Sequence, residues 1–152
     1  MKHLFLLLIA SSILLNGCGG QQEDTPINRE PHYDEVENLH IEWKDLFNQE
    51  EDKYYAYVYS VTCTPCSMLR SEMIEFSQKN YVSFYFIYPS EDIPFVDDES
   101  LAKSSLGKSS LDDVYIYNTP TLIEITNKVI TDYSNDYYEI KSFVESFSEE
   151  SI

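Results

Sequence analysis

Two cysteines separated by two residues, Cys63 and Cys66, are the side chains of this sequence best suited to covalent chemistry. They lie in the segment SVTCTPCSML, residues 60–69, with Pro65 between them. Such a pair can be a redox centre, half of a zinc site, or a cross-link that holds a loop. The surrounding sequence helps to choose among these three roles.

The pair lies where a predicted strand meets a predicted helix, and this placement favours a reactive thiol. The helix is expected to begin at about Cys63, and Pro65 suits its first turn because the missing N–H has no intrahelical partner to lose. Unpaired backbone N–H groups and the positive end of the helix dipole would then surround the Cys63 sulfur. Such surroundings lower the pKa of a thiol below its ordinary value of about 8.5. We therefore predict that Cys63 is the attacking group.

Cys66 is expected one turn further along the same face of this helix, and deeper in the structure. Its predicted role is to attack the mixed disulfide that Cys63 forms with a client, which releases the product. A purely structural disulfide is poorly motivated, because closing so small a loop constrains little of the unfolded chain. Zinc needs four ligands, and after removal of an N-terminal signal peptide only His32 and His40 would be left to join the pair. We therefore expect no metal, and no cofactor apart from the redox-active disulfide.

Predicted strands and helices alternate along the chain and would position the pair. The strands are predicted at residues 39–43, 54–61, 82–88, 121–126 and 129–133. The helices are predicted at residues 43–49, at 65–79 and from about 135 onward. This order predicts an α/β sandwich with a mixed sheet. Residues 91–113 are predicted as a loop followed by one helix or two short ones around Gly107.

The apolar positions of the two longer helices indicate which faces are buried. In the helix after the cysteines, the predicted core positions are Leu69, Met73 and Phe76, widened by Met68 and Ile74. In the last helix, the predicted apolar side consists of Tyr138, Ile140, Phe143, Val144 and Phe147.

The order of motifs resembles thioredoxin and its exported relatives. The strand YAYVYSV leads into CTPC and a helix, and NTPTLIEI is followed by a short hairpin and a terminal helix. The resemblance covers roughly residues 39–147, and its most specific part is the cysteine pair joined to a downstream Thr-Pro-Thr. It implies a thioredoxin-like three-layer sandwich, with a central mixed β-sheet flanked by helices, and the activity of a thiol-disulfide oxidoreductase.

The resemblance also implies roles for residues around the cysteines. Pro120 would follow a cis peptide bond and face the cysteines, so that Thr119 presents its backbone to an extended client segment. The alternative is a proline that simply starts an edge strand. Thr62 would also contact the client, and Thr64 and Pro65 would form the active-site loop between the cysteines.

Three features depart from thioredoxin. Thr62 stands where thioredoxin has Trp, and Tyr57 stands where it has a buried Asp that is thought to assist proton transfer at the second cysteine. Segment 91–113 is longer than the corresponding loop. Similar insertions occur in membrane-tethered relatives that serve cytochrome maturation or bacteriocin export, and no motif here chooses between them. These residues also leave the direction of electron flow open.

Two charged residues near these motifs have alternative interpretations. Arg70, one turn after Cys66, either steers acidic clients and favours the thiolate, or is a solvated residue on the helix surface. Glu124, inside TLIEI, is either an outward-facing charge without a role or part of a proton relay.

The N-terminal sequence predicts export and lipid attachment. Lys2 and His3 precede an apolar run that is too short to span a membrane, which is typical of a secretory signal. Leu-Asn-Gly-Cys at residues 15–18 resembles a bacterial lipobox, so Cys18 is predicted to carry the lipid anchor. The alternative is an ordinary signal peptide with a chance cysteine. The chain then divides into a signal peptide at 1–17, a flexible polar tether at 18–38 and a thioredoxin-like domain at 39–150.

Charge and composition restrict the partners. The formal net charge of −17 argues against nucleic acid, because phosphate contacts need clustered Lys and Arg. We expect a monomer, extracytoplasmic and lipid-anchored to the bacterial cell membrane, that acts on exported protein clients and exchanges electrons with a redox partner protein. The alternative is a non-catalytic accessory or chaperone-like binding module, for example of the bacteriocin-export accessory type, that uses the same edge without turnover.

Overall fold

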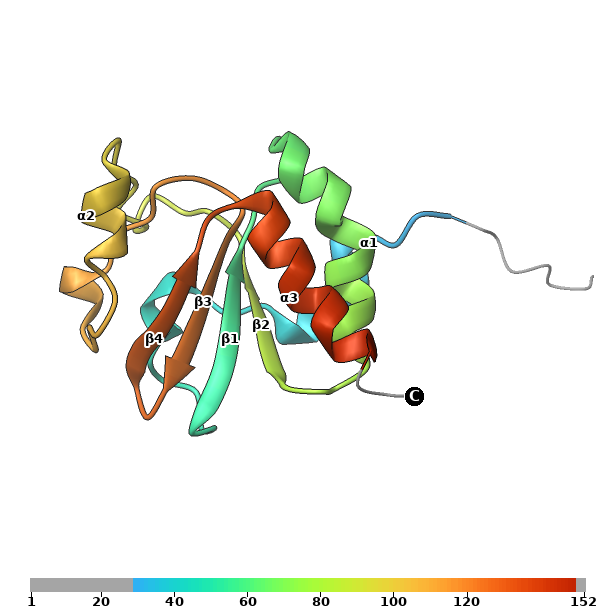
Figure 1. Cartoon of the computed structure of the whole chain (residues 1–152), viewed down its shortest axis with the longest axis horizontal. Helices are drawn as coiled ribbons and strands as arrows, with labels where there is room; N and C mark the ends of the chain where they lie inside the picture. The colour runs from blue at the N-terminus through green and yellow to red at the C-terminus, as the bar shows by residue number, and fades with distance from the viewer. Residues whose placement is uncertain (1–28, 150–152) are drawn as a thin grey trace, which may run out of the picture.

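A mixed four-stranded sheet lies at the centre of the part of the chain that the computed structural model describes, residues 29–149 (Figure 1). The strands follow the order β2 (Ser83–Ile87), β1 (Lys53–Val58), β3 (Thr121–Thr126) and β4 (Val129–Ser134). β1 pairs with β2 in parallel, whereas β1 with β3 and β3 with β4 are antiparallel. The predicted signal peptide and the lipidation of Cys18 lie outside the described residues.

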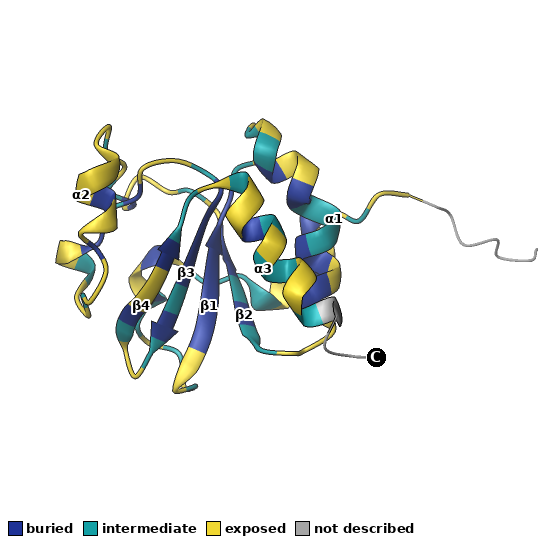
Figure 2. Ribbon diagram, in the orientation of Figure 1, coloured by how far each residue is buried: buried dark blue, intermediate teal, exposed yellow. Residues whose placement is uncertain are grey.

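Burial on both faces explains why the central strands are apolar almost without interruption (Figure 2). In β1 every residue after Lys53 is buried, because successive side chains enter opposite layers. Tyr55 and Tyr57 pack in a first core, whereas Ala56 and Val58 pack in a second. The sheet therefore separates two hydrophobic cores.

Helical segments cover both faces of this sheet. The first core packs against η1 (Tyr33–Leu39), α1 (Thr64–Gln78) and α3 (Tyr137–Glu149). The second core takes in residues of η2 (Trp43–Asp45), α2 (Glu99–Lys103) and η3 (Leu111–Asp113). The expected three-layer α/β sandwich is thus confirmed. Within residues 29–149, no helix combines the length and the apolar character needed to cross a membrane.

Two predicted elements near the start of the domain are wrong. Residues 39–43 do not form a strand but make one isolated bridge, between His40 and Phe86. The helix predicted at 43–49 is only the short 3₁₀ segment η2. Both pieces are short, and their buried side chains, Trp43 and Leu46, enter the second core without needing regular structure around them.

Two predicted core positions are also wrong. Met68 in α1 is 60% exposed and Tyr138 in α3 is 74% exposed. Each helix buries only the stripe that faces its neighbours. Tyr138 lies two residues before the buried Ile140, which places it on nearly the opposite side of the helix, and Tyr137 packs against the core instead.

The predicted tether is wrong where the structure describes it in η1, at residues 33–38. Tyr33 is 5% exposed and Val36 is 1% exposed, and both belong to the first core. A capping box between His32 and Glu35 starts η1. Two apolar residues three apart share one face of a 3₁₀ helix, so even this polar segment can pack. The packed domain therefore begins before the predicted boundary at residue 39.

The insertion at residues 91–113 covers the outer edge of β4. The N–H of Gly107 donates to the carbonyl of Ile130, and the N–H of Ile130 donates to that of Lys108. Gly107 has a positive φ of 79°, which a residue without a side chain adopts readily. The insertion contains α2 and η3 on either side of this glycine, which is the second of the two predicted alternatives, one helix or two short ones.

Candidate functional site

Cys63 and Cys66 form a disulfide at the N-terminus of α1, with their Cα atoms 5.3 Å apart. Cys63 is the N-cap residue, and its sulfur accepts a hydrogen bond of 3.1 Å from the N–H of Cys66. Cys66 is fully buried, whereas Cys63 is partly exposed. Cys63 can therefore be reached from solvent, whereas Cys66 cannot.

A tight turn after β1 places the pair at this helix end. The N–H of Cys63 donates to the carbonyl of Ser60, and the hydroxyl of Ser60 accepts from the N–H of Thr62. Pro65 lies in the first turn of α1, as expected from its missing N–H. Thr62 and Thr64 are exposed on either side of Cys63.

The segment before β3 meets the cysteines because β1 and β3 are neighbours. Thr121, the first residue of β3, pairs with Val58, the last residue of β1. The Thr119–Pro120 peptide bond is cis, as the resemblance implied. The carbonyl oxygen of Thr119 lies 3.1 Å from the Cys63 sulfur. The structure thus brings the two predicted motifs together, although 56 positions separate these two residues in the chain.

The sheet order, the disulfide at the start of α1 and the cis proline before β3 define the fold class. The fold is thioredoxin-like. No family model and no curated protein matches the chain. Among solved structures, thioredoxin f2 of Chlamydomonas reinhardtii is 16% identical with a TM-score of 0.47, covering 72% of this chain and 94% of its own.

Two further thioredoxins give similar values. That of Plasmodium falciparum is 15% identical with a TM-score of 0.43, covering 71% of this chain and 97% of its own. Mitochondrial thioredoxin 3 of Saccharomyces cerevisiae is 13% identical with the same TM-score, covering 71% and 93%. These likenesses are too distant to transfer any activity.

Aromatic side chains outside the two predicted motifs lie near Cys66. The hydroxyl of Tyr33 donates a long hydrogen bond of 3.4 Å to the Cys66 carbonyl, and its ring stacks on Tyr59 with 3.7 Å between centroids. The Tyr59 hydroxyl lies 2.7 Å from Nε2 of His40. Because Nδ1 of His40 faces the carbonyl of Val36 at 3.0 Å, Nδ1 donates and Nε2 accepts from Tyr59. Tyr33 therefore belongs to the surroundings of the disulfide, and Tyr59 and His40 pack behind its ring.

A sequence signal for this segment existed. His32 followed by Glu35 has the spacing of a capping box, and Tyr33 and Val36 have the spacing of one helical face. The signal is weak because only two apolar side chains carry it within a polar stretch.

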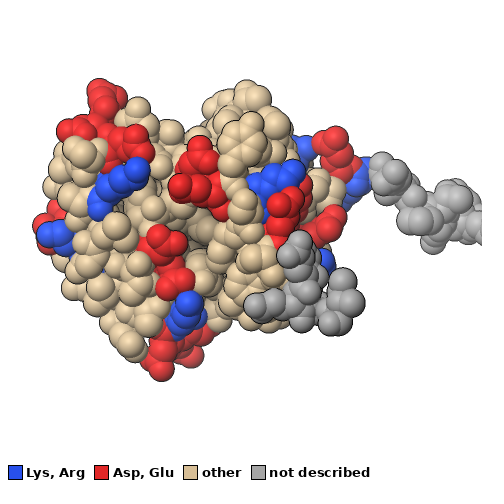
Figure 3. All heavy atoms as spheres, viewed as in Figure 1, with Lys and Arg blue, Asp and Glu red and all other residues tan. Residues whose placement is uncertain are grey.

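The surface around the disulfide carries no charged side chain along residues 60–69, in a protein with a formal net charge of −17. At the top of Figure 3, where α1 begins, the visible surface is neither acidic nor basic. Val61 and Met68 in this segment and Tyr117, three residues before the cis proline, are exposed, with exposed fractions of 59%, 60% and 36%. A polypeptide that reaches Cys63 would thus meet apolar and hydroxyl groups.

The two charged residues with open interpretations have structural partners. Arg70 pairs with Glu30 at 2.7 Å, which joins α1 to the segment before η1. Glu124 accepts hydrogen bonds from Tyr55 and Thr131 and pairs with Lys53. Arg70 is therefore more than a solvated surface residue, and Glu124 holds neighbouring strands together.

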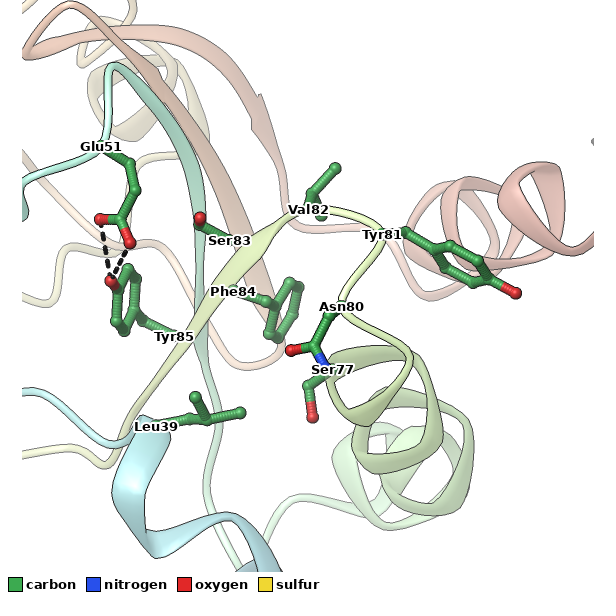
Figure 4. A pocket seen from close by; sticks show the side chains of 9 residues that line it. All are labelled: Leu39, Glu51, Ser77, Asn80, Tyr81, Val82, Ser83, Phe84 and Tyr85. Carbon is green, nitrogen blue, oxygen red and sulfur yellow. Dashed lines mark hydrogen bonds between the residues drawn. The ribbon is translucent and has the colours of Figure 1, made fainter.

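The described cavities do not identify a small-molecule site at the cysteines. One cavity of about 360 Å³ lies between the end of α1 and β2, separated from the disulfide by the length of the helix (Figure 4). Its lining residues are Leu39, Glu51, Ser77, Asn80, Tyr81, Val82, Ser83, Phe84 and Tyr85. Within residues 29–149, no three His, Cys, Asp or Glu side chains are grouped to hold a metal ion.

Proposed function

We propose that this protein is an extracytoplasmic thiol-disulfide oxidoreductase that acts on exported proteins, with Cys63 as the nucleophile and Cys66 as the resolving cysteine. One arrangement carries the proposal: a disulfide at the N-terminus of α1 whose first sulfur is accessible, whose second is buried, and which faces the Thr119 carbonyl. The helix N-terminus stabilises the negative charge that Cys63 bears whenever it is a thiolate.

In the reducing direction, the Cys63 thiolate attacks a client disulfide. A mixed disulfide forms between Cys63 and the client, and the first client sulfur leaves as a thiolate. Cys66 then loses its proton and attacks the Cys63 sulfur, which releases the second client thiolate and leaves the Cys63–Cys66 disulfide. Two electrons pass from the pair to the client. The oxidising direction is the reverse, and begins when a client thiolate attacks the Cys63 sulfur.

The backbone around Thr119 is the proposed docking edge for the client. An extended segment that lies beside Thr119 and Pro120 brings its own cysteine to the accessible sulfur of Cys63. The uncharged surface with Val61 and Met68 favours clients with apolar residues next to the reacting cysteine. A redox partner protein would use the same face to restore the pair.

The sequence supports attachment of this domain to the outer face of the bacterial cytoplasmic membrane through Cys18. Lipid attachment predicts that labelled palmitate is incorporated into the full chain, and that Cys18→Ser abolishes the labelling. A Cys18→Ser chain that is still labelled would contradict this part of the proposal.

The decisive experiment traps the mixed disulfide. Cys66→Ala should accumulate dithiothreitol-sensitive adducts with exported proteins, because the resolving thiol is missing, whereas Cys63→Ser should accumulate none. In insulin reduction with dithiothreitol, Cys63→Ser should fall to the uncatalysed rate. Ser67→Ala, a change at an exposed neighbour, is the matched control.

The same variants separate catalysis from binding alone. If Cys63→Ser retains the full phenotype of the wild-type protein and still binds its clients, the domain is a binding module and the proposal is wrong. Equal adduct formation by Cys66→Ala and Cys63→Ser would likewise contradict the assigned roles.

A further inference from the structure

Tyr57 carries a buried hydroxyl group that makes no hydrogen bond of ordinary geometry in the described part of the chain, and among polar groups the Tyr33 hydroxyl acts on it most strongly. Its side chain is 0% exposed, in the middle of the first core. A buried hydroxyl without a partner destabilises the fold, because it has lost its hydrogen bonds to water. A buried unsatisfied hydroxyl in β1, the strand that leads to the cysteines, requires an explanation.

The resolving cysteine belongs to the same hydrophobic core as this hydroxyl. Tyr57, Tyr33 and Cys66 belong to the same core, and Cys66 is fully buried. The Tyr33 hydroxyl lies close enough to that of Tyr57 for an electrostatic and weak hydrogen-bonding interaction, and it donates to the carbonyl of Cys66 at 3.4 Å. Within residues 29–149, neither hydroxyl is hydrogen-bonded to a carboxylate or an imidazole. The core that holds the buried Cys66 thus also holds two tyrosine hydroxyls.

Both hydroxyls keep their protons at neutral pH. Burial raises the pKa of Tyr33 to about 12, although the Tyr57 hydroxyl and the Arg70 guanidinium act in the opposite direction. Burial also raises the pKa of Tyr57, and the neighbouring Tyr33 raises it further. Each residue therefore offers a hydrogen-bond donor in this core, and neither can serve as a base.

The redox state decides whether an acceptor is present. In the disulfide, the Cys66 sulfur is bonded to Cys63, carries no charge and accepts hydrogen bonds weakly. When the disulfide opens, the same buried sulfur becomes a thiol or a thiolate, and a buried thiolate needs a donor to replace water. Reduction thus creates, inside the first core, the kind of acceptor that Tyr57 lacks.

We propose that Tyr57 is a positioning residue for the reduced form of Cys66: its hydroxyl donates to the Cys66 sulfur once the disulfide opens, and Tyr33 supports it from η1. This inference rests on the proposed function and adds the residues that set the balance between the two redox states. A donor that is satisfied in one state only shifts the equilibrium toward that state. Tyr57 therefore favours the dithiol over the disulfide.

The experiment measures the equilibrium between the full chain and glutathione, in a Cys18→Ser background so that only one pair reacts. Two glutathione thiols give two electrons and two protons to the Cys63–Cys66 disulfide, and one oxidised glutathione forms. Tyr57→Phe should lower this equilibrium constant by about tenfold, the effect of one lost hydrogen bond. Tyr33→Phe should lower it by less, because its hydroxyl has a second acceptor in the Cys66 carbonyl.

Tyr85→Phe is the matched control. Its hydroxyl donates a hydrogen bond to Glu51, and both residues line the cavity of Figure 4. We expect this hydrogen bond to be independent of the redox state of the cysteines. The glutathione equilibrium of Tyr85→Phe should equal that of the wild type. Urea unfolding of the oxidised proteins should show Tyr57→Phe to be at least as stable as the wild type, because an orphan hydroxyl has been removed, and Tyr85→Phe to be less stable.

An unchanged glutathione equilibrium for Tyr57→Phe would overturn the inference. So would an oxidised Tyr57→Phe protein that is destabilised as much as the reduced one, since that result assigns the hydroxyl a structural role in both states. The glutathione equilibrium involves no client protein, so it tests this inference separately from the proposed function. A wild type that equilibrates with glutathione but never exchanges with exported proteins would contradict the proposed function alone.

Discussion

Glu124, for which a proton relay was one interpretation, makes contacts in the structure that hold neighbouring strands together. It lies in β3 with 19% of its side chain exposed, and it contacts Tyr55, Thr131 and Lys53. Burial acts to raise the pKa of its carboxyl, but the hydrogen bonds from Tyr55 and Thr131 and the Lys53 ammonium outweigh burial and lower that pKa. The charged form is therefore stabilised by folding.

Replacing this anion should weaken the fold in a pH-dependent way. We predict that Glu124→Gln lowers the free energy of unfolding at neutral pH by about 1 kcal/mol, because one charged acceptor is lost and water screens part of the ion pair. A depressed pKa adds stability above the unfolded-state value, so the deficit should shrink as pH falls through the folded-state pKa. Urea unfolding of the variant and the wild type at a series of pH values measures this difference in the free energy of unfolding.

Glu75→Gln, at an exposed position of α1, is the control and should behave as the wild type at every pH. A deficit for Glu124→Gln that stays constant down to strongly acidic pH would show that the ionised carboxylate is not the stabilising form.

At the scale of elements, η1 is the segment whose role differs most from its sequence pattern. It packs against α1 and β2, and it brings Tyr33 under the N-terminus of α1. His40 at its end joins β2 through a bridge to Phe86, and its imidazole holds the hydroxyl of Tyr59. The segment η1 thus contributes a side chain, Tyr33, to the surroundings of the disulfide.

This packing predicts a contrast between two neighbouring residues of η1. Val36→Ala should lower the free energy of unfolding by about 2 kcal/mol, because it removes two buried methyl groups and leaves a cavity. Glu37→Ala, at an exposed position of the same element, should change it by less than about 0.5 kcal/mol. Equal effects of the two substitutions, measured by urea unfolding, would mean that the segment is a tether after all.

The same scale shows which elements sequence patterns predict well. β3 was predicted at its observed bounds, since TLIEIT is buried on both faces and is followed by the turn residues Asn127 and Lys128. Both turn residues have positive φ, which matches the turns that join two adjacent strands. η1 and the bridge at His40 were not predicted, because neither has a repeating apolar pattern and both depend on rings from distant strands.

On the scale of the whole domain, residues 29–149, tyrosine is the ionisable side chain whose pKa burial shifts most often. Burial is the largest cause of a raised pKa at each of the tyrosines concerned, whose ordinary value is about 10. The pKa is raised to about 12 at Tyr33, Tyr54, Tyr55 and Tyr85. It is also raised at Tyr57, Tyr59 and Tyr133. The folded protein therefore holds protons that the unfolded chain releases.

Stability should consequently fall at alkaline pH. The free energy of unfolding should stay level up to about pH 9 and decrease above about pH 10, where unfolded tyrosines ionise. Tyrosinate absorbance should rise together with unfolding, since the buried phenols ionise only when exposed. High salt should leave the decline in place, which separates it from general repulsion in an acidic protein. A free energy that is unchanged up to pH 12 would contradict the raised pKa values.

The sequence alone determined the features that depend on near neighbours in the chain. A cysteine pair at a strand-to-helix junction, a proline in the first helical turn, a Thr-Pro-Thr before a strand and a hairpin turn all follow from local backbone chemistry. Tertiary structure decided which side chains surround the cysteines. Tyr33 contacts Cys66 although 33 positions separate them, and the Tyr57 hydroxyl has no hydrogen bond of ordinary geometry. Both results depend on how the aromatic rings pack in the first core. Packing of that kind depends on the whole fold, and no short stretch of sequence encodes it.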